Sequence, residues 1–281
     1  MVPIPEADID RLIADDVAFG DMTTRTLGIA GQAGIIRFTA RDPMVACATE
    51  EAARILARFG AIPRLSLSSG QTAAPGTLLL EATGTAGALH AGWKVAQTLM
   101  EWSAGVASSV RDIIDAARSV APSIVVACTR KSVPMTRALS IKAVLAGGGA
   151  MHRTGLSDTL LVFPEHRAFL GEEPLHSTLA RMRAAAPERA IVVEVANDGD
   201  AMLAIAAGAD VVQLEKFPPE AVARLIGRLN GARPERTRIA AAGGIDASNA
   251  AAYARAGADV LVTSAPYTAK PRDVQVRIAA A

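Results

Sequence analysis

The sequence is poor in aromatic residues and in cysteine. Aromatic side chains make up only 4% of its 281 residues, whereas hydrophobic residues make up 51%. The core must therefore be built mainly from Ala, Val, Ile and Leu. The only two cysteines, Cys47 and Cys128, exclude a disulfide framework and are typical of a protein in a reducing compartment.

The chain also lacks a strong net charge and a long hydrophobic run. Its formal charge is +1, so no global field directs it to nucleic acid or to a membrane. Its apolar runs are well short of the roughly 18 residues that a spanning helix needs. The N-terminus has no basic region followed by an apolar run, so no signal peptide is expected. We expect a cytoplasmic protein that binds neither nucleic acid nor a membrane.

One long segment lacks acidic residues. No Asp or Glu occurs from Ala116 to Ser157, although 28 of the 281 residues are acidic. Within it, "CTRKSVPMTRALSIKAVLAGGGAMHRTGLSD" carries basic residues around three glycines, namely Arg130, Lys131, Arg137, Lys142, His152 and Arg153. Arg137 and Lys142 lie on the next predicted helix and are equally consistent with a solvated face. For the other four, the missing counter-charge favours an anionic ligand.

After residue 120, short apolar runs alternate with helical segments. The runs are Ile124–Cys128, Thr159–Phe163, Ile191–Val195, Val211–Leu214, Ile239–Ala242 and Val260–Thr263. This rhythm is typical of a parallel sheet that helices cover on both sides. Because no dinucleotide-binding glycine fingerprint accompanies it, the pattern favours a β/α barrel over a doubly wound sheet. The first hundred residues predict a separate small α+β unit.

Polar residues and glycines stand at the C-terminal ends of these runs or just beyond them. They are Thr129, Arg130, Lys131, Glu194, Glu215, Gly243, Gly244 and Ser264. Because the carboxyl ends of barrel strands form the active-site mouth, we expect these residues to line one pocket. Gly243 and Gly244, followed by a helix expected to begin near Asp246, predict a phosphate cup of backbone N–H groups. Ser264 at the last strand predicts a second such turn.

Two carboxylates, Glu194 and Glu215, end neighbouring predicted strands. Beside phosphate-binding groups, paired acids are suited to hold Mg²⁺, to bind ribose hydroxyls or to stabilise a cationic sugar carbon. An ion pair with Lys131 or Lys216 is the structural alternative. Together with the basic cluster, the acids favour a phosphorylated sugar that meets a second anion.

Several motifs resemble those of the nicotinate-nucleotide pyrophosphorylase family, also called quinolinate phosphoribosyltransferase. "TRKSVPMTRALSIKAVLAGGGAMHRTGLSD" resembles its TRK…GGG…HR…L.D block, and "DDVAFGDMTT" its N-terminal acidic segment. "VVEVAN" and "VVQLEKF" resemble its acid-bearing strands, and "AAAGGI" its phosphate turn. The resemblance covers almost the whole chain. It implies an α/β sandwich domain with a linking helix over 1–105, and an incomplete β/α barrel over 106–281 whose last residues pack back on the first domain.

The resemblance also implies an activity and site roles. Family members join phosphoribosyl pyrophosphate to a pyridine dicarboxylate with Mg²⁺, releasing pyrophosphate and CO₂. They do so as homodimers in which the partner's N-terminal domain closes each barrel mouth. The implied catalytic residues are Lys131, Glu194 and Glu215, the two acids also being the Mg²⁺ ligands. The implied acceptor-binding residues are Lys94 from the neighbouring subunit, Arg130, His152, Arg153 and His166, and the implied phosphate-binding residues are Ala242, Gly243, Gly244 and Ser264.

The sequence departs from the family pattern at several of these positions. Trp93-Lys94 stands where the family has Glu-Arg, and Phe163-Pro164-Glu165-His166 where it has Lys-Asp-Asn-His. Glu215-Lys216 replaces Asp-Asn, and Ala242 replaces a serine. This set most resembles the ModD subgroup of pyrophosphorylases, which is associated with molybdenum-transport genes. The lost lysine and the gained Phe163 remove a charge and add an apolar wall, so we expect an acceptor other than quinolinate.

Two other classes of function stay open at this point. Lys131 is a candidate Schiff-base amine of a barrel lyase or isomerase, which borohydride would trap in the presence of a carbonyl substrate. Alternatively, the chain is a non-catalytic or regulatory anion-binding protein linked to molybdate metabolism that keeps only the phosphate cup. Such a protein would leave phosphoribosyl pyrophosphate unconsumed.

Overall fold

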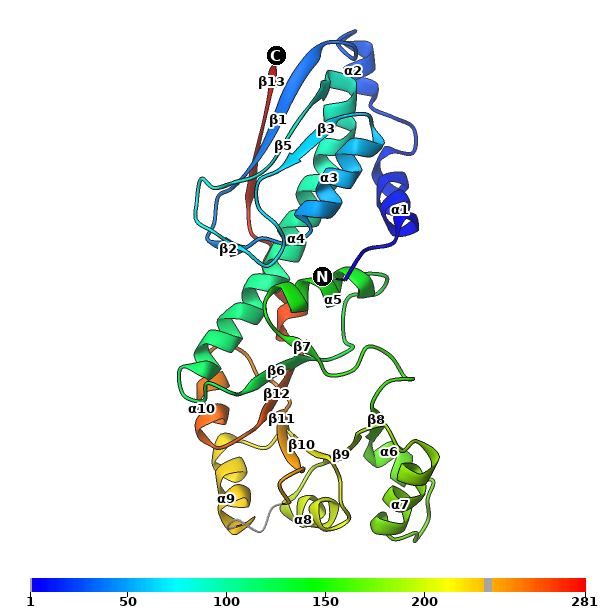
Figure 1. Ribbon diagram of the computed structural model, residues 1–281, viewed down its shortest axis with the longest axis vertical. Coiled ribbons are helices and arrows are strands. Elements are labelled where there is room, and N and C mark those ends of the chain that lie inside the picture. The colour runs from blue at the N-terminus through cyan, green and yellow to red at the C-terminus, as the bar shows by residue number, and fades with distance from the viewer. Residues whose placement is uncertain (1, 230–233) are drawn as a thin grey trace. The chain divides into compact units, whose positions relative to one another are not determined.

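A computed structural model describes residues 2–229 and 234–281, which form two compact units (Figure 1). The first unit contains residues 2–111, 132–148 and 266–281, and the second contains the described residues of 112–131 and 149–265. The boundary expected after residue 105 falls inside helix α4 (Ala86–Arg118). Segment 132–148, which that division counted with the barrel, has its contacts in the first unit, and so do residues 266–281, the last residues that were expected to pack back on the first domain.

The first unit is built on a four-stranded antiparallel sheet. Its strand order is β13 (Val274–Ala280), β1 (Ala33–Ala40), β5 (Leu78–Thr85) and β3 (Ile62–Leu65). Alternate residues of β1, among them Ile36 and Phe38, are fully buried, as the period of two in a strand requires. They belong to one hydrophobic core with residues of α4 and of helix α3 (Thr49–Arg58). The remaining elements are α1 (Glu6–Val17), α2 (Met22–Thr26), α5 (Arg137–Ala146) and the strand pair β2 (Met44–Val45) and β4 (Thr72–Ala73).

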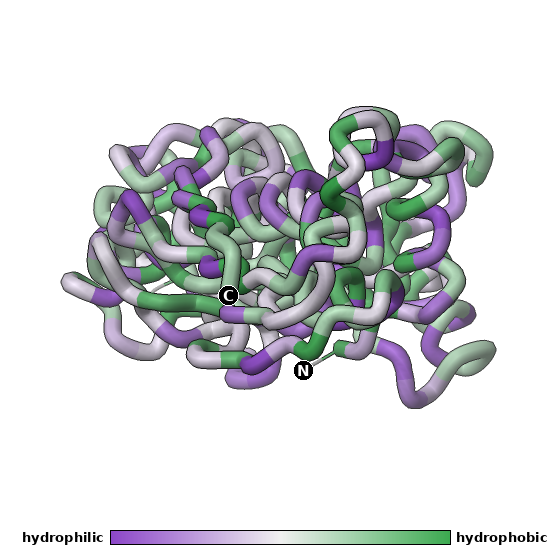
Figure 2. Tube along the Cα trace, turned by 90° about the horizontal axis from the view of Figure 1, so that it is seen from above, coloured by the Kyte–Doolittle hydropathy of each residue, from purple (hydrophilic) through white to green (hydrophobic). Residues whose placement is uncertain are grey.

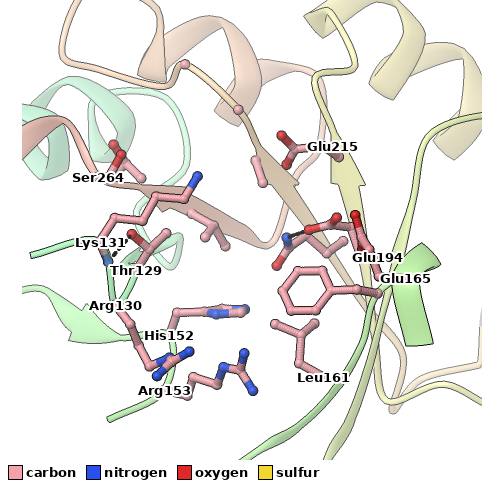
Figure 3. Close-up of a pocket in the computed structure, with 17 residues that line it drawn as sticks. Thr129, Arg130, Lys131, His152, Arg153, Leu161, Glu165, Glu194, Glu215 and Ser264 are labelled. Carbon is pink, nitrogen blue, oxygen red and sulfur yellow. Dashed lines mark hydrogen bonds between the residues drawn. The ribbon is translucent and has the colours of Figure 1, made fainter. Parts of the chain in front are cut away.

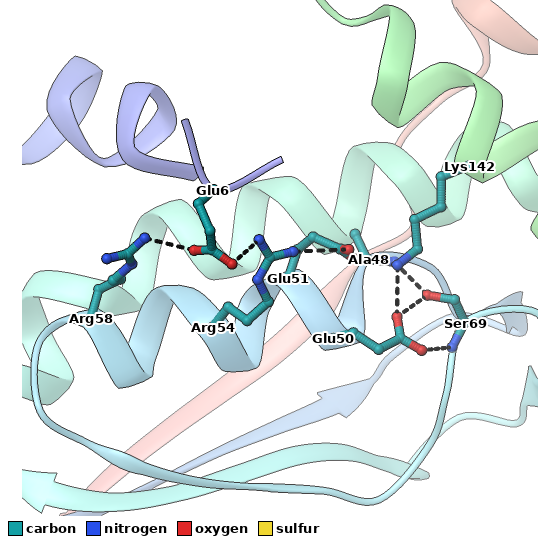
Figure 4. A network of polar contacts seen from close by, with 8 residues as sticks. All are labelled: Glu6, Ala48, Glu50, Glu51, Arg54, Arg58, Ser69 and Lys142. Atoms are coloured by element: carbon teal, nitrogen blue, oxygen red, sulfur yellow. Dashed lines mark hydrogen bonds and ion pairs between the residues drawn. The ribbon is translucent and has the colours of Figure 1, made fainter. Parts of the chain in front are cut away.

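Helix α5 is joined to this unit by a buried ionic network around Lys142 (Figure 4). Lys142 is only 3% exposed, and its Nζ donates to Glu51 at 2.5 Å and to Glu50 at 3.0 Å. Burial lowers the pKa of Lys142, but the hydrogen bonds and charges of the two glutamates outweigh it, so that the pKa is raised. The solvated face that was one alternative for Lys142 is therefore excluded. Its counter-charges come from α3, far away in the sequence.

The second unit is built on a seven-stranded parallel sheet. Its order is β7 (Ala150–Met151), β6 (Val125–Cys128), β12 (Val260–Thr263), β11 (Arg238–Ala242), β10 (Val211–Glu215), β9 (Ile191–Val195) and β8 (Leu160–Val162). The strands follow the chain order around the sheet, which stays open between β7 and β8. This arrangement confirms the predicted incomplete β/α barrel. The six predicted runs all form strands, and only the two-residue β7 is additional.

Helices connect the barrel strands. They are α6 (Pro164–Arg167), α7 (Leu175–Ala185), α8 (Asp198–Ala206), α9 (Pro219–Leu229) and α10 (Ala250–Arg255), with a 3₁₀ turn at Ala265–Thr268. Hydrophobic and hydrophilic stretches alternate at short intervals along the whole trace (Figure 2). Among the described residues, no helix combines the length and the apolar character that crossing a membrane requires.

Candidate active site

The carboxyl ends of the barrel strands surround a pocket of about 530 Å³ in the second unit (Figure 3). Twelve of its lining residues were expected from the sequence: Thr129, Arg130, Lys131, His152, Arg153, Phe163, Glu194, Glu215, Ala242, Gly243, Gly244 and Ser264. The other lining residues are Leu161, Glu165, Gln213, Val262 and Thr263. Arg130 and Arg153 lie together at one end of the pocket, whereas Glu215 and Ser264 lie at the other end (Figure 3).

The acids of the pocket stand on two paired strands. Glu194 of β9 is the register partner of Gln213 on β10, and the Gln213 amide donates to Glu194 at 2.6 Å. Burial raises the pKa of Glu194, and the nearby charges of Glu215 and Glu165 raise it further, against the opposing effects of Gln213 and Lys131. The raised pKa means that the folded protein disfavours the charged form of Glu194. A cation bound beside these carboxylates would therefore be stabilised by their negative charge.

Gln213 is a pocket residue that the sequence analysis missed. It is buried, and it precedes Glu215 by two residues in "VVQLE". Because alternate residues of a strand share a face, the position of Glu215 at the mouth was the signal that could have indicated Gln213.

The basic end of the pocket is formed by Arg130, His152 and Arg153. The backbone N–H of His152 donates to the Cys128 carbonyl at 2.9 Å, which extends the pairing of β6 with β7 by one residue. Burial lowers the pKa of His152, the charge of Arg153 lowers it further, and the Gln213 amide counteracts part of this. His152 is therefore mainly neutral at pH 7, and the positive charge of this end belongs to the two arginines.

The expected phosphate cup is a turn rather than a helix N-terminus. Gly243 and Gly244 have φ angles of +98° and +78°, and a Cβ on Gly243 would lie only 2.9 Å from the backbone nitrogen of Lys216. Helix α10 begins at Ala250, and a hydrogen-bonded turn from Asp246 precedes it. The Asp246 carboxylate accepts hydrogen bonds from Ser248, and the Asp246 carbonyl accepts from the backbone N–H of Ala250 at 3.0 Å, so the turn leads into the helix.

Two of the expected acceptor-binding residues do not line this pocket. Nδ1 of His166 accepts a hydrogen bond from the Phe163 backbone N–H at 3.0 Å, and the two rings stack, so His166 supports the pocket wall from behind. Lys94 belongs to the first unit, where its Nζ donates to Gln97 at 2.9 Å and lies 4.9 Å from the Trp93 ring. There it borders a groove of about 470 Å³ together with Asp15 and Asp16.

A divalent cation would need ligand atoms beyond the protein. Among the described residues, no group of three or more His, Cys, Asp or Glu side chains is placed to hold a metal ion. Glu194 and Glu215 together offer two carboxylates at adjoining strand ends. Mg²⁺ commonly uses one or two carboxylates and completes its octahedron with substrate phosphates and water, so the pair fits this ion.

An open parallel barrel whose mouth combines a glycine turn, paired acids and a cluster of arginines has the architecture of a phosphoribosyltransferase. The sequence also matches two protein-family models, which identify the family. Residues 106–277 match the C-terminal domain of quinolinate phosphoribosyl transferase, and residues 21–104 match its N-terminal domain. The chain belongs to this family, as the sequence motifs indicated, and is an enzyme of the pentosyltransferase class.

Individual relatives agree with this assignment. The chain is 52% identical to a Rhodobacter capsulatus protein that carries the name pyrophosphorylase ModD, over 92% of this chain and 98% of that protein. It is 32% identical to an Archaeoglobus fulgidus protein named as a carboxylating nicotinate-nucleotide pyrophosphorylase, over 70% of this chain and 75% of that protein. The crystal structure of NadC from Streptococcus pyogenes has the same fold, with a TM-score of 0.88 at 24% identity, covering 98% of this chain and 96% of that one.

Proposed function

We propose that this enzyme transfers the phosphoribosyl group of phosphoribosyl pyrophosphate to a nitrogen heterocycle other than quinolinate, with release of pyrophosphate. The observation that carries the proposal is one pocket that joins the glycine turn, the paired acids, Lys131 and the two arginines. The bond between the ribose C1 and the pyrophosphate oxygen breaks, and a bond from C1 to the ring nitrogen forms.

Each part of the pocket has a role in this reaction. The turn at Gly243 and Gly244 and the Ser264 hydroxyl would bind the sugar phosphate. Glu194 and Glu215 would stabilise the positive charge that develops on the ribose ring. Mg²⁺, held by the same two carboxylates, would shield the charge of the pyrophosphate.

The remaining basic residues would serve the leaving group and the acceptor. The exposed ammonium group of Lys131 would neutralise negative charge on the departing pyrophosphate. The guanidinium groups of Arg130 and Arg153 would hold the acceptor, with His152 as a neutral hydrogen-bonding group beside them.

The alternatives explain less of the pocket. A barrel lyase that forms a Schiff base on Lys131 would leave the glycine turn and the pair Glu194 and Glu215 without a role. A regulatory anion-binding protein would need the glycine turn but would have no use for Glu194 and Glu215. The membership of this chain in the quinolinate phosphoribosyl transferase family favours neither alternative.

The oligomeric state, the cellular location and the physiological role also belong to this proposal. We propose a homodimer with shared active sites, in which Lys94 of one subunit serves the pocket of the other. The proposed location is the cytoplasm, which suits the two free, buried cysteines. A physiological link to molybdenum is proposed from the similarity to the ModD protein of Rhodobacter capsulatus.

The test is a panel of nitrogen heterocycles assayed for pyrophosphate release from phosphoribosyl pyrophosphate with Mg²⁺. At least one acceptor should support turnover, and Lys131→Ala should lower it by at least about tenfold, since a charge contact made in the transition state is worth a few kcal/mol. Lys270→Ala, an exposed lysine of the other unit, is the matched control and should be unchanged. Full activity of Lys131→Ala would contradict the role assigned to Lys131. Trapping of Lys131 by borohydride in the wild type would contradict it as well.

A further inference from the structure

Arg153 is a buried cation that makes no close ion pair. It is 8% exposed, and among the described residues no carboxylate forms a salt bridge with it. Burial lowers its pKa and the positive charge of Arg130 lowers it further, whereas the charge of Asp158 raises it. Two guanidinium groups at one end of a pocket, one of them almost fully buried, form a strong site for one planar anionic group.

Phe163 forms an apolar wall directly beside this cation. The guanidinium carbon of Arg153 lies 5.7 Å from the centre of the Phe163 ring, within the range of a cation–π contact. The ring is fixed from behind, because His166 stacks on it at 5.7 Å with an angle of 23° between the planes. Pro164, at the first position of α6, restrains the backbone of the turn. Leu161 extends the apolar surface along the pocket.

The far side of this wall is acidic. Glu165 follows Phe163 by two residues and lines the same pocket, and its charge adds to that of Glu215 in raising the pKa of Glu194. An acceptor that reaches from the arginines along the wall therefore meets apolar atoms first and carboxylates next. A second acidic group on this part of the acceptor would lose its hydration beside the carboxylates of Glu165 and Glu194, whose negative charges would repel it.

We propose that the acceptor is an aromatic nitrogen heterocycle with a single acidic group. Its acidic group binds between Arg130 and Arg153, and its ring packs against Phe163 and Leu161. Phe163 is then the residue that selects a monoacid over a diacid. This inference rests on the proposed transferase function, since it names the acceptor class of the same pocket.

The test is calorimetric binding to the full-length protein of three probes: nicotinate, quinolinate and nicotinamide. These are a monoacid, a diacid and a neutral amide on the same pyridine ring. The wild type should bind nicotinate at least about tenfold more tightly than either of the others, because hydrogen bonds to charged groups contribute that much. Phe163→Lys places a cation at the wall and should shift the ratio of the two acids towards quinolinate by about tenfold.

Two further variants separate charge from packing. Phe163→Leu keeps the wall apolar and should weaken binding of all three probes without changing their order. Arg153→Met should remove the preference for nicotinate over nicotinamide. Circular dichroism would establish that each variant is folded, and Phe163→Leu keeps the inference testable if Phe163→Lys fails to fold.

The outcomes distinguish this inference from the proposed function. Wild-type binding of quinolinate as tight as that of nicotinate, binding of none of the probes, or an unchanged ratio in folded Phe163→Lys would each overturn the inference. Pyrophosphate release with diacid acceptors alone would also overturn it while leaving the transferase function intact. Conversely, the expected order of binding without any consumption of phosphoribosyl pyrophosphate would overturn the function and leave the pocket's preference standing.

Discussion

His152 is held in its neutral form by the groups around it. Its ordinary pKa of 6.5 is lowered by burial and by the adjacent charge of Arg153, although the Gln213 amide acts in the opposite direction. A neutral imidazole next to two arginines can accept or donate a hydrogen bond without adding repulsion to the basic end of the pocket. The same lowered pKa links the stability of the protein to pH.

The pH dependence of stability should therefore change in His152→Asn. Because the unfolded chain binds a proton at this histidine more tightly than the folded protein does, the contribution is present above pH 6.5 and is lost as the pH falls from there towards the folded pKa. Urea unfolding of the wild type should show a fall in unfolding free energy between about pH 7.5 and about pH 5.5, the range in which histidine titrates. The fall should be smaller in His152→Asn. A fall in this variant as large as that of the wild type would count against the assignment.

At the residue scale, the sequence predicts charges at strand ends better than it predicts their partners. Lys131, Glu194 and Glu215 were expected at the mouth because they lie at the C-terminal ends of predicted strands or just beyond them. The partners of Lys142 could not be expected, since Glu50 and Glu51 are more than 90 positions away and meet it only in the folded unit. His166 faces away from the pocket because its ring nitrogen caps the turn at Phe163, a local hydrogen bond that a motif does not reveal.

At the element scale, the glycine turn after β11 combines two different constraints. Gly243 is confined by the backbone of Lys216, which itself has a positive φ of 59°. A Cβ on Gly244 would meet no atom within 4 Å, so its side of the turn is open to a ligand. The sequence indicated both glycines as phosphate-binding, but only the structure separates the one required by packing from the one open to the anion.

Gly244→Ala should weaken phosphoribosyl pyrophosphate far more than the acceptor. The new methyl group would occupy the open side of the turn, and the strain of a positive φ would add roughly 1 kcal/mol, a cost that is separate from the ligand. Gly60→Ala is the control, because it has the same kind of strain at φ +90° in the other unit and also meets no atom within 4 Å. Steady-state kinetics should show a raised KM for phosphoribosyl pyrophosphate in Gly244→Ala alone. Equal weakening of both substrates would contradict the assignment.

Helix α5 is held to the other elements of the first unit by the ion pairs of Lys142. Replacing Lys142 by Met would leave Glu50 and the 2% exposed Glu51 without their main counter-charge, although Arg54 lies 3.7 Å from Glu51. Removing one partner of a buried ion pair typically costs about 3–5 kcal/mol. We therefore expect Lys142→Met to lower the unfolding free energy by several kcal/mol in urea titrations.

Two comparisons make this prediction specific. Arg37→Met removes the ion pair between Arg37 and Glu81, whose arginine is 53% exposed, and should cost only about 0–1 kcal/mol. In the double variant of Lys142→Met and Glu51→Leu, stability should return in part, because an apolar pair replaces an isolated charge. A loss in Lys142→Met no larger than that in Arg37→Met would show that the network contributes little.

At the scale of the whole molecule, the alternation of strands and helices was enough to predict the barrel but not the composition of each unit. Helix α5 and strand β13 belong to the first unit although barrel strands precede them in the chain, and β13 pairs with β1 over seven residues. Their membership depends on contacts between distant segments, which no local sequence pattern contains. Val95, Leu99 and Met100 of the linking helix are buried in the core of their own unit. The apolar surface of α4 therefore does not by itself require a partner subunit.

The dimer proposal rests instead on Lys94, and subunit complementation tests it. The catalytic pocket is lined by residues of the second unit alone, whereas Lys94 belongs to the first and is exposed. Lys94→Ala and Lys131→Ala should each be at least about tenfold less active than the wild type. When equal amounts exchange subunits, half of the dimers are mixed and each has one intact pocket of two, so activity should rise to roughly a quarter of that of the wild type. Lys131→Ala mixed with Lys131→Met is the control and should stay at the level of the single variants, because every pocket lacks this lysine. If tagged subunits demonstrably exchange and the first mixture shows no rise in activity, Lys94 does not act across a shared interface.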